Sequence, residues 1–131
     1  VGRAPYVVPM SYGFDWPEDG KPTFYLHCAG EGLRLSLIRK NPRVCVEISK
    51  QIRIVPGSVP CSWTSKYKSV IAFGTAHILT DLSDKAAVLR QSGYKDTAKF
   101  TSEMLTRVTA LRIDVESMTG KSNLRPDEED I

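Results

Sequence analysis

The sequence predicts a mainly β protein with short helices, in which antiparallel strands form a closed or partly closed barrel. About six segments show the alternation typical of strands, and turn-forming residues separate them. Strands do not alternate regularly with long helices, which disfavours a doubly wound parallel sheet. With 131 residues, 41% of them hydrophobic, the chain has enough apolar material for one core. We expect one domain over residues 1–121 and a polar, acidic, disordered tail over residues 122–131.

The first two expected strands form a β-hairpin. Residues 5–15, PYVVPMSYGFD, are β-branched and aromatic, and Pro5 and Pro9 indicate an edge or an irregular strand. The turn EDGK at residues 18–21 leads into a second strand, PTFYLHC, at residues 22–28.

The remaining strands lie further along the chain. Residues 44–54 place their Val and Ile side chains mostly on one face, and residues 56–68 are dense in turn formers. Residues 69–79, SVIAFGTAHIL, predict a strand that is apolar on both faces. Gly74 within it indicates a bend or a close approach of another backbone. The segment TALRIDVES at residues 109–117 alternates cleanly between apolar and charged side chains.

Three short helices are expected between these strands. The first follows Gly32 and ends before Asn41 and Pro42. The segments at residues 81–91 and 100–108 have the capping residues and apolar spacing of two further helices.

The junction FYLHCAGEGLRLSLIRK, residues 24–40, is the candidate functional site. His27 and Cys28 end a strand, a glycine turn follows, and a cationic helix begins at once. The turn leaves backbone N–H groups unpaired at the positive end of the helix dipole, with Arg34 close by, which favours a bound anion such as phosphate. Two structural alternatives stay open: the glycines could only make a tight connection, and His27 could be the satisfied polar end of a strand.

Charge and cysteine content limit the function classes. A net charge of +3 is too small and scattered to favour nucleic acid or a membrane surface as a partner, while a small anionic ligand is compatible with it. The cysteines, Cys28, Cys45 and Cys61, are odd in number and far apart, which favours neither disulfides nor a metal site. We therefore expect a cytoplasmic protein without a signal peptide or membrane span. The chain begins directly with VGRAPYVVPM, so we leave open that another segment precedes it.

Four stretches, in order and spacing, carry a resemblance to a known family. They are PYVVPMSYGFD, FYLHCAGEGLRLSLIRKNPRVCVEI, YKSVIAFGTAHIL and LRIDVESMTGK. Together they resemble the flavin-nucleotide-binding split-barrel proteins related to pyridoxamine 5'-phosphate oxidase, and especially the 5-nitroimidazole resistance (Nim-type) proteins. The resemblance covers residues 5 to about 121. It implies a six-stranded antiparallel split barrel, a homodimer, and FMN in a groove at the dimer interface.

The resemblance also implies which residues bind FMN. Residues 8–11 would line the isoalloxazine ring with backbone groups, and His27 and Cys28 would lie beside the phosphate or ribityl chain. Ser69 matches the position from which the partner subunit touches the flavin. The full implied cofactor-binding set is Val8, Pro9, Met10, Ser11, His27, Cys28, Gly32, Leu33, Arg34 and Ser69.

Two of these positions depart from the family pattern. Cys28 stands where relatives often have a hydroxyl residue, and a thiol is the weaker hydrogen-bond partner. Leu33 replaces a basic residue of the oxidase relatives, whereas Arg34 matches a basic phosphate ligand. Both departures are expected to lower the affinity for FMN.

The implied activity is that of an FMN-dependent oxidoreductase reducing small planar or nitro-aromatic compounds. His27 is the expected catalytic residue, as proton donor or substrate anchor. Two alternatives stay open: a non-catalytic flavin- or haem-binding carrier or sensor, and a catalytically empty split-barrel dimer that acts as an interaction domain.

Overall fold

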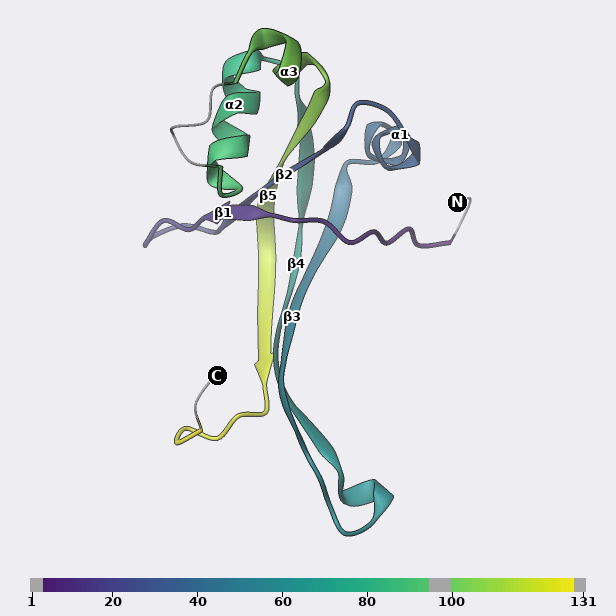
Figure 1. Cartoon of the computed structure of the whole chain (residues 1–131), viewed down its shortest axis with the longest axis vertical. Helices are drawn as coiled ribbons and strands as arrows, with labels where there is room; N and C mark the ends of the chain where they lie inside the picture. Colours follow the sequence, from purple (N-terminus) through teal and green to yellow (C-terminus); the bar gives the residue numbers. More distant parts are fainter. Residues whose placement is uncertain (1–3, 95–99, 129–131) are drawn as a thin grey trace. The chain divides into compact units, whose positions relative to one another are not determined.

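A computed structural model describes residues 4–94 and 100–128. The elements, in chain order, are β1 (Gly13–Asp15), β2 (Thr23–Ala29), α1 (Leu33–Lys40), β3 (Arg43–Val55), the 3-10 helix η1 (Pro60–Ser62), β4 (Thr64–Leu79), α2 (Leu82–Gln91), α3 (Ser102–Thr106) and β5 (Val108–Ser122). The strands form one sheet in the order β1-β2-β5-β4-β3 (Figure 1). The predicted class, mainly antiparallel β with short helices, is confirmed.

The described residues contain five strands, whereas six were expected. Each of the five segments named above as a strand contains one, and the first is the shortest, because residues 5–12 are irregular and only Gly13–Asp15 pairs with β2. Pro5 and Pro9 have no N–H group to donate, so this segment cannot form a continuous ladder. Its β-branched and aromatic residues therefore mark an extended segment rather than a strand.

The chain divides into two compact units, and the first comprises Val1–Val44 and Gly74–Glu116. In it β2 pairs antiparallel with β5, so that Leu26 lies opposite Leu111. Alternation along β5 buries Leu111, Ile113 and Val115, as the sequence predicts. A separate cluster packs α2 and α3 together through Ala86, Leu89 and Leu105, with Phe100 and Val108 against it.

Gly74 lies where β4 and β5 approach each other closely. A Cβ atom at this position would lie 2.3 Å from the backbone oxygen of Asp114, which is shorter than any van der Waals contact. This confirms the prediction that Gly74 permits a close backbone approach.

The second unit comprises Cys45–Phe73 and Ser117–Ile131. It is a hairpin of β3 and β4, with η1 in the connection, accompanied by the end of β5 and the residues that follow it (Figure 1). Among its described residues only Ala72 is buried, so this unit has no core of its own. Ser122, the last residue of β5, and residues 123–128 all lie within the expected tail; the domain boundary at residue 121 stays a prediction.

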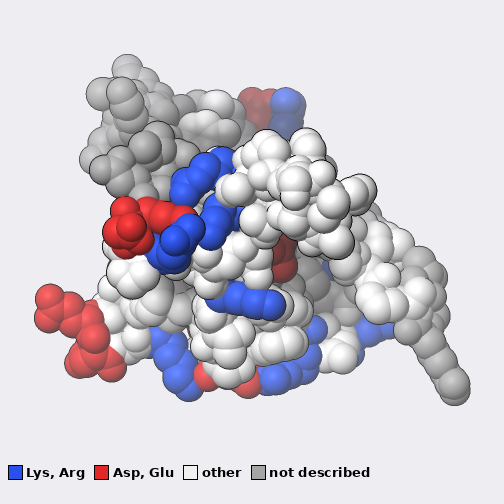
Figure 2. Space-filling model, turned by 90° about the horizontal axis from the view of Figure 1, so that it is seen from below, with Lys and Arg blue, Asp and Glu red and all other residues white. Residues whose placement is uncertain are grey.

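Charged side chains of both signs lie on the surface. On the face drawn in Figure 2, Lys and Arg are interspersed with Asp and Glu among larger areas of uncharged residues. No helix in the described part of the chain is long and apolar enough to cross a membrane.

Candidate functional site

The junction between β2 and α1 presents an open helix N-terminus. Gly32 precedes the helix with a φ of 150°, a backbone conformation that favours glycine. No side chain in the described part of the chain caps this end of α1, and the Gly32 carbonyl accepts a hydrogen bond from the backbone N–H of Ser36 at 3.2 Å. The N–H groups of the first helical turn therefore have no intrahelical partner and can donate to an anion.

A pocket of about 210 Å³ lies at this junction. It is lined by Tyr6, Cys28, Ala29, Glu31, Gly32, Leu33, Arg34 and Leu35. Four of the ten predicted cofactor-binding residues thus come together: Cys28, Gly32, Leu33 and Arg34. No sequence pattern predicts Tyr6 as a lining residue, because its position depends on the path of the irregular N-terminal segment.

Arg34 is the basic side chain of the pocket. Its Nε atom is buried and has no hydrogen-bond partner among the described residues. The next residue, Leu35, is 1% exposed and anchors the helix in the core. A buried, unsatisfied guanidinium nitrogen is unfavourable unless a ligand bonds to it, so it indicates where an anion would bind.

Glu31 brings a negative charge to the same pocket. Its carboxylate forms an ion pair with Arg39 at 3.4 Å. Arg39 and Lys40 occupy the last turn of α1, where cations complement the helix dipole. The ion pair partly neutralises Glu31, and it leaves Arg34 as the cation directed at the pocket.

His27 does not line this pocket. Successive side chains of a strand point to opposite faces, so His27 and Cys28 lie on opposite faces of β2. The His27 ring packs edge-on against Tyr94, with centroids 5.8 Å apart. Its Nδ1 atom is buried and, within the described residues, has no hydrogen-bond partner.

The other predicted residues lie outside the pocket. Val8 and Met10 are half-buried and Pro9 and Ser11 are exposed, all in the irregular N-terminal segment that also supplies Tyr6. Ser69 lies on β4 in the second unit. The roles of these residues toward a flavin ring stay predictions.

A larger pocket of about 400 Å³ lies between β2 and α2 and is lined by Tyr25, Ala87, Arg90 and Gln91. Burial raises the pKa of the Tyr25 phenol, and the nearby Asp15 carboxylate raises it further. Tyr25 therefore stays a neutral hydrogen-bond donor. This pocket contains none of the predicted residues and has no open helix N-terminus, so it is the weaker candidate for a phosphate.

The His, Cys, Asp and Glu side chains in the described part of the chain do not form a metal centre. No group of three or more His, Cys, Asp or Glu residues there could hold an ion. The groups that converge at the β2–α1 junction suit a small oxyanion instead.

Solved structures share this fold. A candidate 5-nitroimidazole antibiotic resistance protein from Bacteroides thetaiotaomicron superposes with a TM-score of 0.74 and 27% identity, covering 92% of this chain and 70% of that one. The flavocytochrome Anf3 from Azotobacter vinelandii has a TM-score of 0.74 and 18% identity, covering 99% of this chain and 61% of the other. For an FAD and heme binding protein from Mycobacterium smegmatis the TM-score is 0.68 and the identity 18%, with 91% and 61% covered.

These likenesses confirm the predicted split-barrel fold class. The chain spans less than two thirds of the length of the Azotobacter and Mycobacterium proteins. No curated protein matches it. The sequence model of the family described as pyridoxamine 5'-phosphate oxidase matches residues 1–122, nearly the whole chain. The chain therefore belongs to the pyridoxamine 5'-phosphate oxidase family.

Proposed function

We propose that this protein binds FMN and acts as an FMN-dependent oxidoreductase on small planar or nitro-aromatic compounds. The observation that carries the proposal is the buried Nε of Arg34, which has no hydrogen-bond partner within residues 4–94 and 100–128, in a pocket at the N-terminus of α1. Both features favour a terminal phosphate, and charge-assisted hydrogen bonds to phosphate are stronger than neutral ones. Family membership and the fold shared with flavin-binding proteins support the same assignment.

The size of the pocket limits what it can hold. A site that encloses a whole cofactor-sized ligand usually measures roughly 300–1,000 Å³. At about 210 Å³, this pocket suits the phosphate end of FMN and not the entire molecule. The ring would extend along the segment that contains Val8, Pro9, Met10 and Ser11, whose neighbour Tyr6 lines the pocket. Further enclosure by Ser69 of a second subunit belongs to the same proposal.

The chain's residues have distinct roles in this proposal. Arg34 and the first-turn N–H groups of α1 hold the phosphate, while Cys28 and Leu33 contribute weaker contacts. Bound FMN supplies the electron transfer, whereas the protein binds and orients it. FMN is favoured over FAD because its phosphate is terminal and can enter a pocket of only about 210 Å³. The name of the Bacteroides protein supports a nitro-aromatic substrate class. The Mycobacterium protein is described as binding FAD, so the choice between FMN and FAD is measured directly below.

The phosphate site is tested by flavin binding. We expect wild-type protein to bind FMN more tightly than riboflavin or FAD. Arg34→Ala should weaken FMN binding by about 1.5–3 kcal/mol, the usual net value of a hydrogen bond to a charged group, and leave riboflavin binding unchanged. Lys40→Ala is the matched control, since Lys40 lies in the last turn of α1 and does not line the pocket. Equal affinity for FMN and riboflavin, or unaltered FMN affinity in Arg34→Ala, would contradict the proposal.

The role of His27 is tested separately, because it lies outside the phosphate pocket. If it donates a proton to the substrate, His27→Gln should slow nitro-aromatic turnover and remove a pH dependence, with bound flavin retained. Loss of stability with unchanged turnover per bound flavin would assign it a packing role against Tyr94. Reduction of bound flavin by NAD(P)H, followed by reoxidation with a nitro-aromatic compound, separates a reductase from a non-catalytic flavin carrier.

A further inference from the structure

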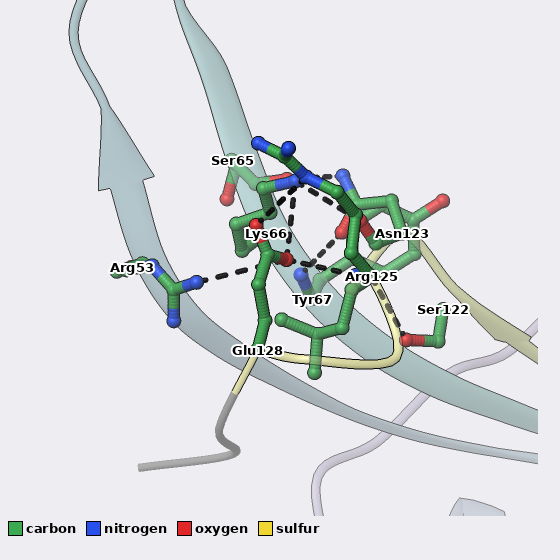
Figure 3. A network of polar contacts seen from close by, with 9 residues as sticks. Arg53, Ser65, Lys66, Tyr67, Ser122, Asn123, Arg125 and Glu128 are labelled. Carbon is green, nitrogen blue, oxygen red and sulfur yellow. Dashed lines mark hydrogen bonds and ion pairs between the residues drawn. The ribbon is translucent and has the colours of Figure 1, made fainter.

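Residues 123–128 fold back onto the hairpin of the second unit. Asn123 continues the pairing of β5 with β4: its N–H donates to the carbonyl of Tyr67 at 3.4 Å. Its side chain acts as one more peptide group, because Oδ1 accepts from the Tyr67 N–H at 2.9 Å and Nδ2 donates to the Ser65 carbonyl at 2.7 Å (Figure 3). The segment is thereby fixed to β4 before it reaches Glu128.

The Glu128 carboxylate lies at the centre of a group of cations (Figure 3). It accepts a hydrogen bond from the backbone N–H of Arg125 at 2.8 Å, and the Arg125 Nε lies 3.3 Å away. Lys66 Nζ lies 3.4 Å and Arg53 Nη2 3.7 Å from the same carboxylate. The cations come from β3, from β4 and from the C-terminal segment itself.

The Lys66–Glu128 pair in this group is more enclosed than an ordinary surface ion pair, whereas the Arg53 and Arg125 side chains are 41% and 75% exposed. The side chains of Lys66 and Glu128 are only 14% and 15% exposed. Lys66 also donates to the Asn123 carbonyl at 3.1 Å, which holds its ammonium group in place. The Arg125 N–H bond, more than any other contact, holds the pKa of Glu128 below its usual range, so the carboxylate is ionised near neutral pH.

We propose that Arg53, Lys66 and Arg125 form an anion site for a phosphate-bearing small molecule, and that Glu128 occupies this site as an internal competitor. Three cations approach the Glu128 carboxylate, and such a cluster also suits phosphate, a group with more charge and more acceptor oxygens. Because Glu128 belongs to the same chain, its effective concentration at the site is high, and an outside anion must displace it. The site lies in the second unit and does not depend on the pocket at Arg34.

Tripolyphosphate binding tests the proposal, measured by isothermal titration calorimetry at constant ionic strength. All proteins carry Arg34→Ala, so that the pocket of the first unit does not contribute. Adding Glu128→Gln should tighten binding by about tenfold or more, the change that corresponds to removing one charged competitor worth about 1.4 kcal/mol. The matched control is Asp127→Asn, which removes an equal charge from an exposed neighbour and should change the affinity less than about twofold.

Lys66→Met, combined with Glu128→Gln, should remove the gained affinity. Circular dichroism confirms that each variant is folded. The proposal is overturned if Glu128→Gln binds no more tightly than its parent, or if Asp127→Asn gives the same gain. It is also overturned if the gain persists with Lys66→Met. Faster amide exchange at Tyr67 in Glu128→Gln, without tighter tripolyphosphate binding, would show that Glu128 only holds residues 123–128 against β4. That result would refute the anion site.

Discussion

Arg34 carries an energetic conflict that a ligand can resolve. Its Nε atom is removed from water without a partner in the described residues, which opposes folding. A ligand that binds only the folded chain stabilises it by mass action. A phosphate bonded to Arg34 would therefore both fill the proposed site and supply the missing partner of its Nε atom.

Gly74 offers a direct test of backbone packing. Gly74→Ala should destabilise the protein by about 1–3 kcal/mol, the usual effect of forcing extra atoms into a packed region, because the new Cβ meets the Asp114 carbonyl. Gly120→Ala is the matched control, since its Cβ would lie 3.9 Å from the Ser69 carbonyl, an ordinary contact. Urea denaturation of both variants measures the difference. Equal stability of the two would show that β4 and β5 do not approach as closely as described.

Some residue roles could be predicted from the sequence and others could not. Gly32 and Arg34 were predictable because a glycine turn before a helix fixes local geometry within a few residues. Tyr6 was not, because it reaches the pocket through the path of an irregular segment. The separation of His27 from Cys28 follows from strand alternation, yet which face of β2 meets which helix depends on the whole first unit.

At the scale of the element, α2 begins with a well-formed cap. The Asp81 carboxylate accepts from the N–H groups of Ser83 at 2.8 Å and Asp84 at 3.2 Å, and from the Ser83 hydroxyl at 2.5 Å. The hydrogen bond from that hydroxyl is the main reason why the pKa of Asp81 lies below its usual value of 3.8. The charged form also interacts favourably with the helix dipole.

This cap predicts a pH dependence. A lowered pKa in the folded state means that the stabilisation is present above about pH 4 and is lost as the pH falls through the folded-state pKa. Asp81→Asn keeps a capping side chain but cannot titrate. Its melting temperature should therefore fall less between pH 6 and pH 3 than that of the wild type. Asp19→Asn, in the exposed turn before β2, should behave as the wild type does, and a parallel fall in all three proteins would contradict the prediction.

Element boundaries show where local pattern stops being informative. The strands expected near residues 22–28, 44–54 and 69–79 are present because their apolar alternation reflects burial. β5 continues to Ser122, beyond the last clear alternation, since the backbone of β4 supplies hydrogen bonds there without demanding apolar side chains. Sequence periodicity shows which side chains are buried, but it does not show which backbones pair by hydrogen bonds. The extension of β5 to Ser122 therefore could not be predicted.

At the scale of the whole molecule, the described residues of the second unit form no buried core, and several large apolar side chains among them are exposed. Ile54, Val59, Trp63, Ile71 and Phe73 are all exposed. Apolar area of this kind usually marks an interaction surface. We predict a homodimer in which a second copy covers it, with a mass by light scattering of twice the 14.6 kDa chain. A monomer mass at micromolar concentration would overturn this prediction.

Variants locate the interface. Ile71→Ser with Phe73→Ser should shift the dimer toward monomer, because both side chains lie on one face of β4. The matched control is Met104→Ser, which changes an equally exposed apolar residue of α3 in the first unit. Equal dissociation in both variants would show that exposed apolar area in general, and not the β4 face, governs assembly.

The pairing of β2 with β5 also determines when the protein can acquire its ligand. Thr23 pairs with Asp114, and the Thr109 hydroxyl bonds to the Gly30 carbonyl at 3.3 Å, so the turn before α1 is held by residues far along the chain. Contacts of such long sequence separation close large loops and slow folding. On the ribosome, β5, which supports the β2–α1 junction, is synthesised after β1 to β4. The pocket at this junction is thus completed only after β5 has emerged, and binding of the proposed phosphate group has to follow the pairing of β5 with β2.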